Sequence, residues 1–135
     1  MNEAPERLRN VRQWVARAEN DLRNAEHTLT LQDNCPFDTV CFHAQQCAEK
    51  YLKALLVFRS TDFPKTHDLV ILLRLLSGGE SIAMPVDEVQ PLNRYTIEAR
   101  YPGDWEPITR VDAEEAVRIA RSVRDGVRTH LPKPA

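Results

Sequence analysis

Apolar residues recur every three to four positions along the first 30 residues of the chain. This spacing covers one stripe of an α-helix and predicts a helix over about residues 5–30. The stripe consists of Leu8, Val11, Trp14, Val15, Ala18, Leu22, Ala25 and Leu29. The opposite side carries Arg9, Arg12, Arg23 and several acidic residues.

A second helical pattern follows Asn34, Cys35 and Pro36 and continues to about residue 58. Asp38 is the expected N-cap of this helix. The apolar arc is wide enough for the central helix of a bundle and consists of Val40, Cys41, Ala44, Cys47, Ala48, Tyr51, Leu52, Ala54, Leu55 and Phe58. The opposite face is polar and carries His43, Gln46, Glu49, Lys50 and Lys53.

Two shorter segments come next. Thr66 or His67 is expected to open a short apolar helix that ends at the Gly-rich residues 77–79. A fourth segment covers about residues 86–100 and contains Pro91. Because proline removes a backbone donor, we expect the helix to kink or restart there.

The last helix is predicted to start at Asp112, with Glu115 reaching back as in a capping box. Amphipathic helices joined mainly by short loops pack economically as an up-and-down bundle. We therefore predict one all-α domain over residues 1–135, built as an antiparallel up-and-down bundle of four to five helices.

The composition is that of an ordinary globular domain, with 42% hydrophobic and 28% charged residues. The longest apolar stretch, residues 69–76, is too short to span a bilayer. The N-terminal residues lack the apolar segment of a secretory signal. We expect a cytoplasmic protein without a membrane partner.

Charge and cysteine content narrow the chemistry. A formal net charge of −2 gives no broad attraction to phosphate backbones, so any contact with nucleic acid has to be local. The three cysteines lack CxxC spacing, which argues against a disulfide framework and a thiolate zinc site. We expect no metal and no cofactor.

Three sequence blocks carry a family resemblance: residues 41–56 (CFHAQQCAEKYLKALL), residues 65–69 (KTHDL) and residues 99–102 (ARYP). With Trp14 and Asp21 placed before them, the blocks resemble the HEPN domain family (higher eukaryotes and prokaryotes nucleotide-binding). The resemblance implies a helical bundle, frequent homodimerisation, and a minimal nucleotidyltransferase encoded beside it. Such pairs look like toxin and antitoxin modules.

The resemblance leaves three functions open. The leading hypothesis is a non-catalytic module that binds a nucleotide or RNA and works with a nucleotidyltransferase partner. The second is a metal-independent ribonuclease toxin, since some HEPN branches carry an Arg and a His four to six residues apart. Arg124 and His130, with five residues between them, fit this spacing, although they fall at the end of the last helix. The third is a structural dimeric adaptor.

Gln46, Lys50 and Lys53 project from one helix face and are candidates for binding a phosphate or a base edge. Alternatively, this face is solvated or lies in a dimer contact, with Glu49 and Lys53 as an i,i+4 ion pair. His67, at a helix start, is a candidate for binding an anion, or it caps and packs there.

Arg100 and Tyr101 are candidates for clamping a nucleotide by a phosphate contact and stacking. Alternatively, Arg100 pairs with Glu49 or with a helix end. Trp105 is a stacking surface or a lid. A basic row on the last helix could follow a phosphate backbone or form a solvated face, and it consists of Arg118, Arg121, Arg124 and Arg128.

Overall fold

The computed structural model describes residues 3–78, 82, 84–96 and 107–133. Its elements are α1 (Glu3–Leu29), α2 (Phe37–Phe58), α3 (Leu69–Leu76), α4 (Val86–Val89), the 3-10 helix η1 (Gln90–Tyr95) and α5 (Arg110–Arg128). No strand occurs in these ranges. The predicted all-α bundle is confirmed.

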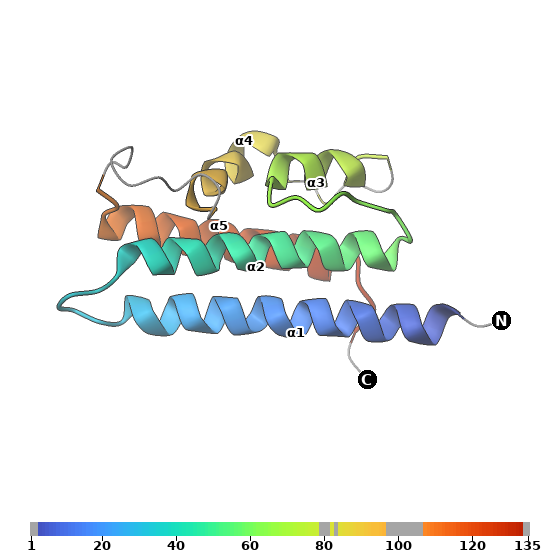
Figure 1. The fold of residues 1–135 in the computed structure, drawn as a ribbon, viewed down its shortest axis with the longest axis horizontal. Coiled ribbons are helices and arrows are strands. Elements are labelled where there is room, and N and C mark those ends of the chain that lie inside the picture. The colour runs from blue at the N-terminus through green and yellow to red at the C-terminus, as the bar shows by residue number, and fades with distance from the viewer. Residues whose placement is uncertain (1–2, 79–81, 83, 97–106, 134–135) are drawn as a thin grey trace.

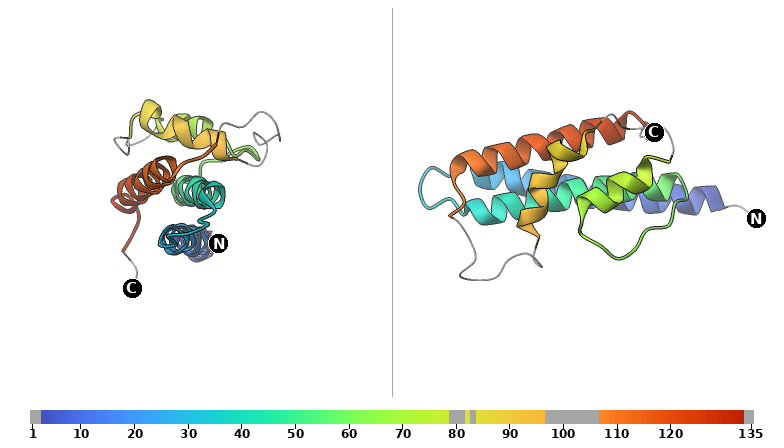
Figure 2. Two further views of the ribbon diagram at one scale, coloured as in Figure 1. Left: turned by 90° about the vertical axis from the view of Figure 1, so that its left-hand side faces the viewer. Right: turned by 90° about the horizontal axis from the view of Figure 1, so that it is seen from above.

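The three long helices lie side by side, with α2 between α1 and α5 (Figures 1 and 2). α1 and α2 run antiparallel, as the short loop between them requires. α5 runs in the same direction as α2, because the segments between them, among them α4 and η1, first bring the chain back to the other end of the bundle (Figure 1). These shorter elements form a second layer over α2 and α5, on the side away from α1 (Figure 2).

The core follows the apolar arcs read from the sequence. α2 contributes most of it, with side chains such as Tyr51, Leu52 and Leu55 fully buried. Cys41 and Cys47 are fully buried free cysteines, as their place in the arc predicted. Burial raises the pKa of Cys41 to about 11 and raises that of Cys47 further. Both thiols therefore act as small hydrophobic residues.

The start of α2 differs from the prediction. Its N-cap is Pro36, which makes no side-chain cap bond, and Asp38 lies inside the first turn. There the Asp38 carboxylate accepts a hydrogen bond from the backbone N–H of Thr39 at 2.9 Å. Asp38 as the N-cap was therefore wrong, although its charge still complements the positive end of the helix dipole.

The start of α5 is also earlier than predicted. Its N-cap is Thr109, whose hydroxyl accepts from the backbone N–H of Asp112 at 3.2 Å. The Asp112 carboxylate in turn accepts from the backbone N–H of Thr109 at 2.9 Å. The capping box is thus formed by Thr109 and Asp112, and the predicted box of Asp112 with Glu115 was wrong. Glu115 instead pairs with Arg118.

Pro91 has the predicted effect on the fourth segment. α4 ends at Val89, and the chain continues as η1 with Pro91 in its first positions. η1 ends at Tyr95 and is followed by extended Thr96, so the helix stops before the predicted end at residue 100. Among the described residues, no helix combines the length and apolarity that crossing a membrane requires.

Candidate functional site

The polar face of α2 is largely covered by protein. Glu49 is only 3% exposed and Lys53 only 7% exposed. The expectation of a solvated face was wrong for these two residues, because α1 and the segment that follows α2 pack over them. Trp14 of α1 and Phe63 of that segment both lie against the Lys53 ammonium group.

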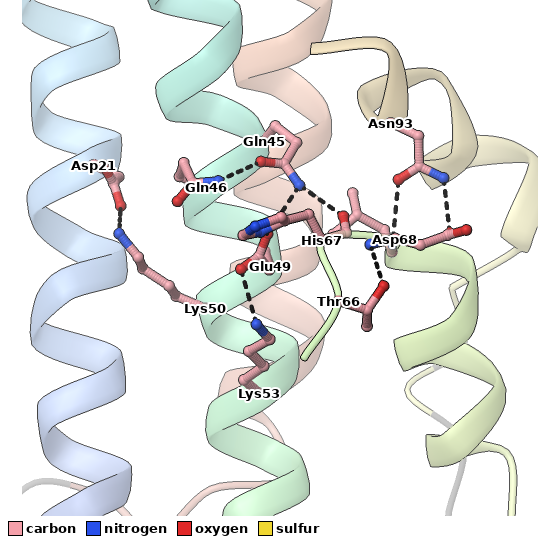
Figure 3. Close-up of polar contacts among 11 residues, drawn as sticks. Asp21, Gln45, Gln46, Glu49, Lys50, Lys53, Thr66, His67, Asp68 and Asn93 are labelled. Atoms are coloured by element: carbon pink, nitrogen blue, oxygen red, sulfur yellow. Dashed lines mark hydrogen bonds and ion pairs between the residues drawn. The ribbon is translucent and has the colours of Figure 1, made fainter. Parts of the chain in front are cut away.

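Glu49 is the centre of a hydrogen-bond network, shown in Figure 3. One carboxylate oxygen accepts from Lys53 Nζ at 3.0 Å, and the other lies 2.8 Å from His67 Nδ1. Gln45 Nε2 donates to Glu49 at 3.2 Å and to the backbone oxygen of His67 at 3.0 Å. Gln46 Nε2 donates to Gln45 Oε1 at 2.7 Å. We call these five residues the Glu49 network.

Lys53 is stabilised by aromatic rings as well as by Glu49. Its ammonium nitrogen lies 5.6 Å from the centre of the Trp14 ring and 5.7 Å from that of Phe63. The two rings pack edge to face, with their centres 6.5 Å apart. A cation over desolvated aromatic faces gains electrostatic energy, which helps to offset the cost of its burial.

A separate clamp fixes the backbone next to His67. Asp68 is the N-cap of α3, where its carboxylate accepts from the backbone N–H of Val70 at 2.9 Å. Asn93 of η1 donates to the same carboxylate at 2.9 Å and accepts from the backbone N–H of Leu69 at 3.0 Å (Figure 3). The expected cap at Thr66 or His67 was therefore wrong, since the helix begins at Leu69.

Asp21 of α1 joins α1 to the outer edge of α2. One of its carboxylate oxygens lies 2.8 Å from His43 Nδ1, and the other accepts from Lys50 Nζ. Lys50 is directed toward α1, and Figure 3 shows it turned away from Lys53. The Lys50 and His43 side chains stay partly exposed, at 22% and 27%.

Glu19 makes a third polar junction, between all three long helices. Its carboxylate accepts from the hydroxyl of Tyr51 on α2 and lies 3.3 Å from a guanidinium nitrogen of Arg128 on α5. Burial and the hydrogen bond to Glu19 raise the pKa of Tyr51. This hydroxyl therefore stays protonated and serves to hold the helices together.

The basic row of α5 is neutralised along its length. Arg118 donates to Glu115 at 2.9 Å, and Arg121 donates to Glu26 of α1 at 2.7 Å. Arg124 donates to Asp125 at 3.0 Å, while Arg128 pairs with Glu19 as above. This pattern fits the solvated-face alternative better than a track for phosphates.

The structure brings some of the predicted site residues together. Gln46, Lys53 and His67 belong to the Glu49 network, whereas Lys50 pairs with Asp21. Arg100 and Tyr101, as well as Trp105, lie outside the described residues. Arg124 is held within α5 by Asp125, and His130 lies two residues beyond the end of that helix.

The sequence analysis did not predict the contacts of three residues in these polar clusters: Gln45, Asp21 and Asn93. For Gln45 a signal exists, because Gln45, Glu49 and Lys53 are spaced i,i+4 and share one helix face. The partners of Asp21 and Asn93 lie 22 to 29 positions away, at His43, Lys50 and Asp68. Local spacing carries no signal for contacts of that kind.

Comparison with known protein families identifies the family of this chain, because the model of the HEPN domain family matches residues 11–130. The chain belongs to the HEPN domain family. The resemblance inferred from the three sequence blocks is thereby confirmed. In this HEPN domain, the first two blocks supply the Glu49 network and Asp68, while Asn93 of η1 completes the clamp.

Individual relatives cover nearly the whole HEPN domain protein. A protein of Methanocaldococcus jannaschii named "Putative toxin MJ1304" is 29% identical to this chain over an alignment 134 residues long. The alignment covers 87% of this chain and 86% of the relative. The crystal structure of TT1696 from Thermus thermophilus superimposes with a TM-score of 0.71 at 31% identity, over 97% of this chain and 100% of that chain.

A second crystal structure is that of ST0689, an archaeal HEPN homologue. It is 26% identical to this chain and has a TM-score of 0.66, covering 89% of this chain and 96% of that one. Within the described part of our HEPN domain, no group of three or more His, Cys, Asp or Glu side chains is placed to hold a metal ion.

Proposed function

We propose that this HEPN domain protein is a nucleotide- or RNA-related binding module, forms a homodimer, and acts with a minimal nucleotidyltransferase in a toxin–antitoxin-like pair. We further propose that it has no catalytic activity of its own. Its likeness to "Putative toxin MJ1304" and its family membership support the first part. The Glu49 network supports the second.

The observation that carries the non-catalytic assignment is the way Glu49 uses its neighbours. A metal-independent ribonuclease needs a base of near-neutral pKa and a cation that binds the phosphate. In the Glu49 network, the His67 imidazole and the Lys53 ammonium group both bind the Glu49 carboxylate. That arrangement stabilises the packing of α2 instead of presenting an acid, a base and a cation to a substrate.

We place the ligand at the exposed edge of the network, where the His67 side chain is 43% exposed and Gln46 is half-buried. The Gln46 amide can donate to and accept from a base edge. Arg100 and Tyr101 are proposed to complete this site.

The experiment that tests the proposal has two arms. The chain is co-expressed with the nucleotidyltransferase encoded beside it, and the purified protein is incubated with nucleotide or total RNA in the absence of metal, with both bound ligand and RNA cleavage measured. We expect a stable complex and no RNA cleavage above that of the His67→Ala, Arg100→Ala and His130→Ala variants. Cleavage that is lost in one variant would establish a ribonuclease instead. A complex without nucleotide or RNA binding would support the structural adaptor.

A further inference from the structure

The outward face of α1 carries an unusual concentration of positive charge. Arg9, Arg12, Arg17 and Arg23 are all exposed on this helix. We call these four residues the α1 arginine face. The sequence placed Arg9, Arg12 and Arg23 on the polar side of this helix, but the acidic residues interspersed with them suggested a side of mixed charge.

The tertiary structure separates these opposite charges. Glu19 faces Tyr51 and Arg128, Asp21 faces His43 and Lys50, and Glu26 faces Arg121. Glu19, Asp21 and Glu26 are thus neutralised by α2 or α5, whereas the exposed Glu6 lies one turn before Arg9 at the end of this face. The positive charges remain on the outside.

The arginines of this face have no acidic partner within the described part of the chain. Arg23 donates to the neutral Oδ1 of Asn20 at 3.3 Å, and no hydrogen bond or ion pair joins Arg9, Arg12 or Arg17 to another described residue. At 100° per residue, Arg9, Arg12 and Arg23 fall within an arc of about 60°. Because a helix rises about 1.5 Å per residue, the 14 positions from Arg9 to Arg23 span about 21 Å.

The absence of apolar groups indicates what kind of partner would bind this face. Protein interfaces contain an apolar and aromatic centre, and single-stranded nucleic acids stack on exposed aromatic rings. In the described residues, the exposed large hydrophobic side chains are Leu31, Ile71, Val86 and Val111, and none of them belongs to α1. The charge and the composition of the face therefore favour the backbone of a duplex.

The polar residues among the arginines favour RNA over DNA. Gln13, Asn20 and Asn24 are exposed on the same side of α1. Amide side chains both donate and accept hydrogen bonds, which matches the ribose 2′-hydroxyl that DNA lacks. Guanidinium groups bind phosphates in a bidentate manner. We propose that the α1 arginine face docks on the phosphate and ribose backbone of double-stranded RNA.

This proposal does not depend on the pairing with a nucleotidyltransferase. The test uses the full chain and measures the fluorescence anisotropy of a labelled RNA duplex of about 20 base pairs. The test variant is Arg9→Gln/Arg12→Gln/Arg23→Gln. The control is Arg118→Gln/Arg121→Gln/Arg124→Gln on α5. Both remove three positive charges, so they change the net charge equally, and circular dichroism checks that both fold.

We expect the α1 variant to bind the duplex at least about tenfold more weakly at low salt. Its plot of log K against log salt should be shallower by about 2 to 3, since each lost phosphate contact contributes roughly 0.7 to 0.9. The α5 control should stay within about twofold of the unmodified protein, because its arginines are already paired. The same sequence as a DNA duplex or as single-stranded RNA should bind more weakly.

Several outcomes would overturn the proposal. If the α5 control bound the RNA duplex as weakly as the α1 variant, the loss of affinity would come from net charge and not from the α1 arginine face. If the unmodified protein bound the DNA duplex or the single-stranded RNA as tightly as the RNA duplex, the face would not be specific for double-stranded RNA. Loss of the nucleotidyltransferase complex in the α1 variant, with RNA binding unchanged, would make the face a protein interface. If RNA binding fails while that complex persists, only the present proposal fails.

Discussion

The Lys53 ammonium group lies 3.0 Å from the Glu49 carboxylate, one helical turn away on α2, and both side chains are buried. Trp14 and Phe63 cover the Lys53 ammonium group, and His67 and Gln45 bind the Glu49 carboxylate. On an exposed helix face, an i,i+4 pair of this kind contributes a few tenths of a kcal/mol. Here neither charge can turn to water, so each one depends on the other.

Glu49→Gln should therefore lower the free energy of unfolding by about 3 kcal/mol, because it leaves the Lys53 charge buried without a counter-charge. Urea denaturation measures this change. Combining Glu49→Gln with Lys53→Met should restore part of the loss, since no unpaired charge remains. Glu114→Gln, on the exposed side of α5, is the control and should change stability by less than about 0.5 kcal/mol. A loss below about 1 kcal/mol for Glu49→Gln would contradict the buried pair.

Asp21→Asn should cost less, about 1 kcal/mol, although Asp21 also binds a lysine and a histidine. The reason is exposure, because Lys50 can extend into water when its partner is neutralised. The same urea titration compares the two variants directly. If Asp21→Asn proved more destabilising than Glu49→Gln, the ranking of the two junctions by burial would be wrong.

Asp68 and Asn93 should be energetically coupled. Each helps to start α3, and they bond to each other at 2.9 Å. We expect a coupling free energy of about 1 kcal/mol from a double-mutant cycle with Asp68→Ala and Asn93→Ala. Thr109→Ala combined with Asn93→Ala serves as the uncoupled reference, since Thr109 caps a different helix. Strict additivity within the first pair would argue against the clamp.

The capping box of α5 should make stability depend on pH. The backbone N–H of Thr109 lowers the pKa of Asp112 below its usual value of 3.8. A depressed pKa in the folded state stabilises the protein above that usual value, and the contribution is lost as the pH falls through the folded-state pKa. Asp112→Asn should therefore cost about 0.5 to 1 kcal/mol at pH 7. Thermal unfolding scans from pH 7 to about pH 2 should show the difference from the unmodified protein shrinking at acid pH, and a constant difference would count against this role.

The bundle was predictable from the sequence because its signals are local. The recurrence of Val11, Ala18 and Leu22, or of Cys47, Tyr51 and Leu55, reflects helix geometry within a few turns. The caps were less predictable, because Asp38 competes with Pro36, and Asp112 with Thr109, over a few positions. Small differences in backbone conformation decide between such neighbours.

The candidate site could be predicted only in part. Helical spacing placed Gln46, Lys50 and Lys53 on one face and offered Glu49 as the i,i+4 partner of Lys53, and the structure confirms that pair. The partner of Lys50 could not be predicted in this way, because Asp21 belongs to α1. The burial of Glu49 follows from α1 and from the segment before α3, and the periodicity of α2 contains no information about either.

By itself, the sequence determined the helices, the apolar arcs and the family, since each depends on residue types at short and fixed spacing. Only the tertiary structure decided which charges are neutralised. Glu26 and Arg121 are 95 positions apart, and their contact leaves Arg23 facing outward. Charges separated so far along the chain meet only after the helices pack, so the pairing on α5 and the exposed arginines on α1 are properties of the fold.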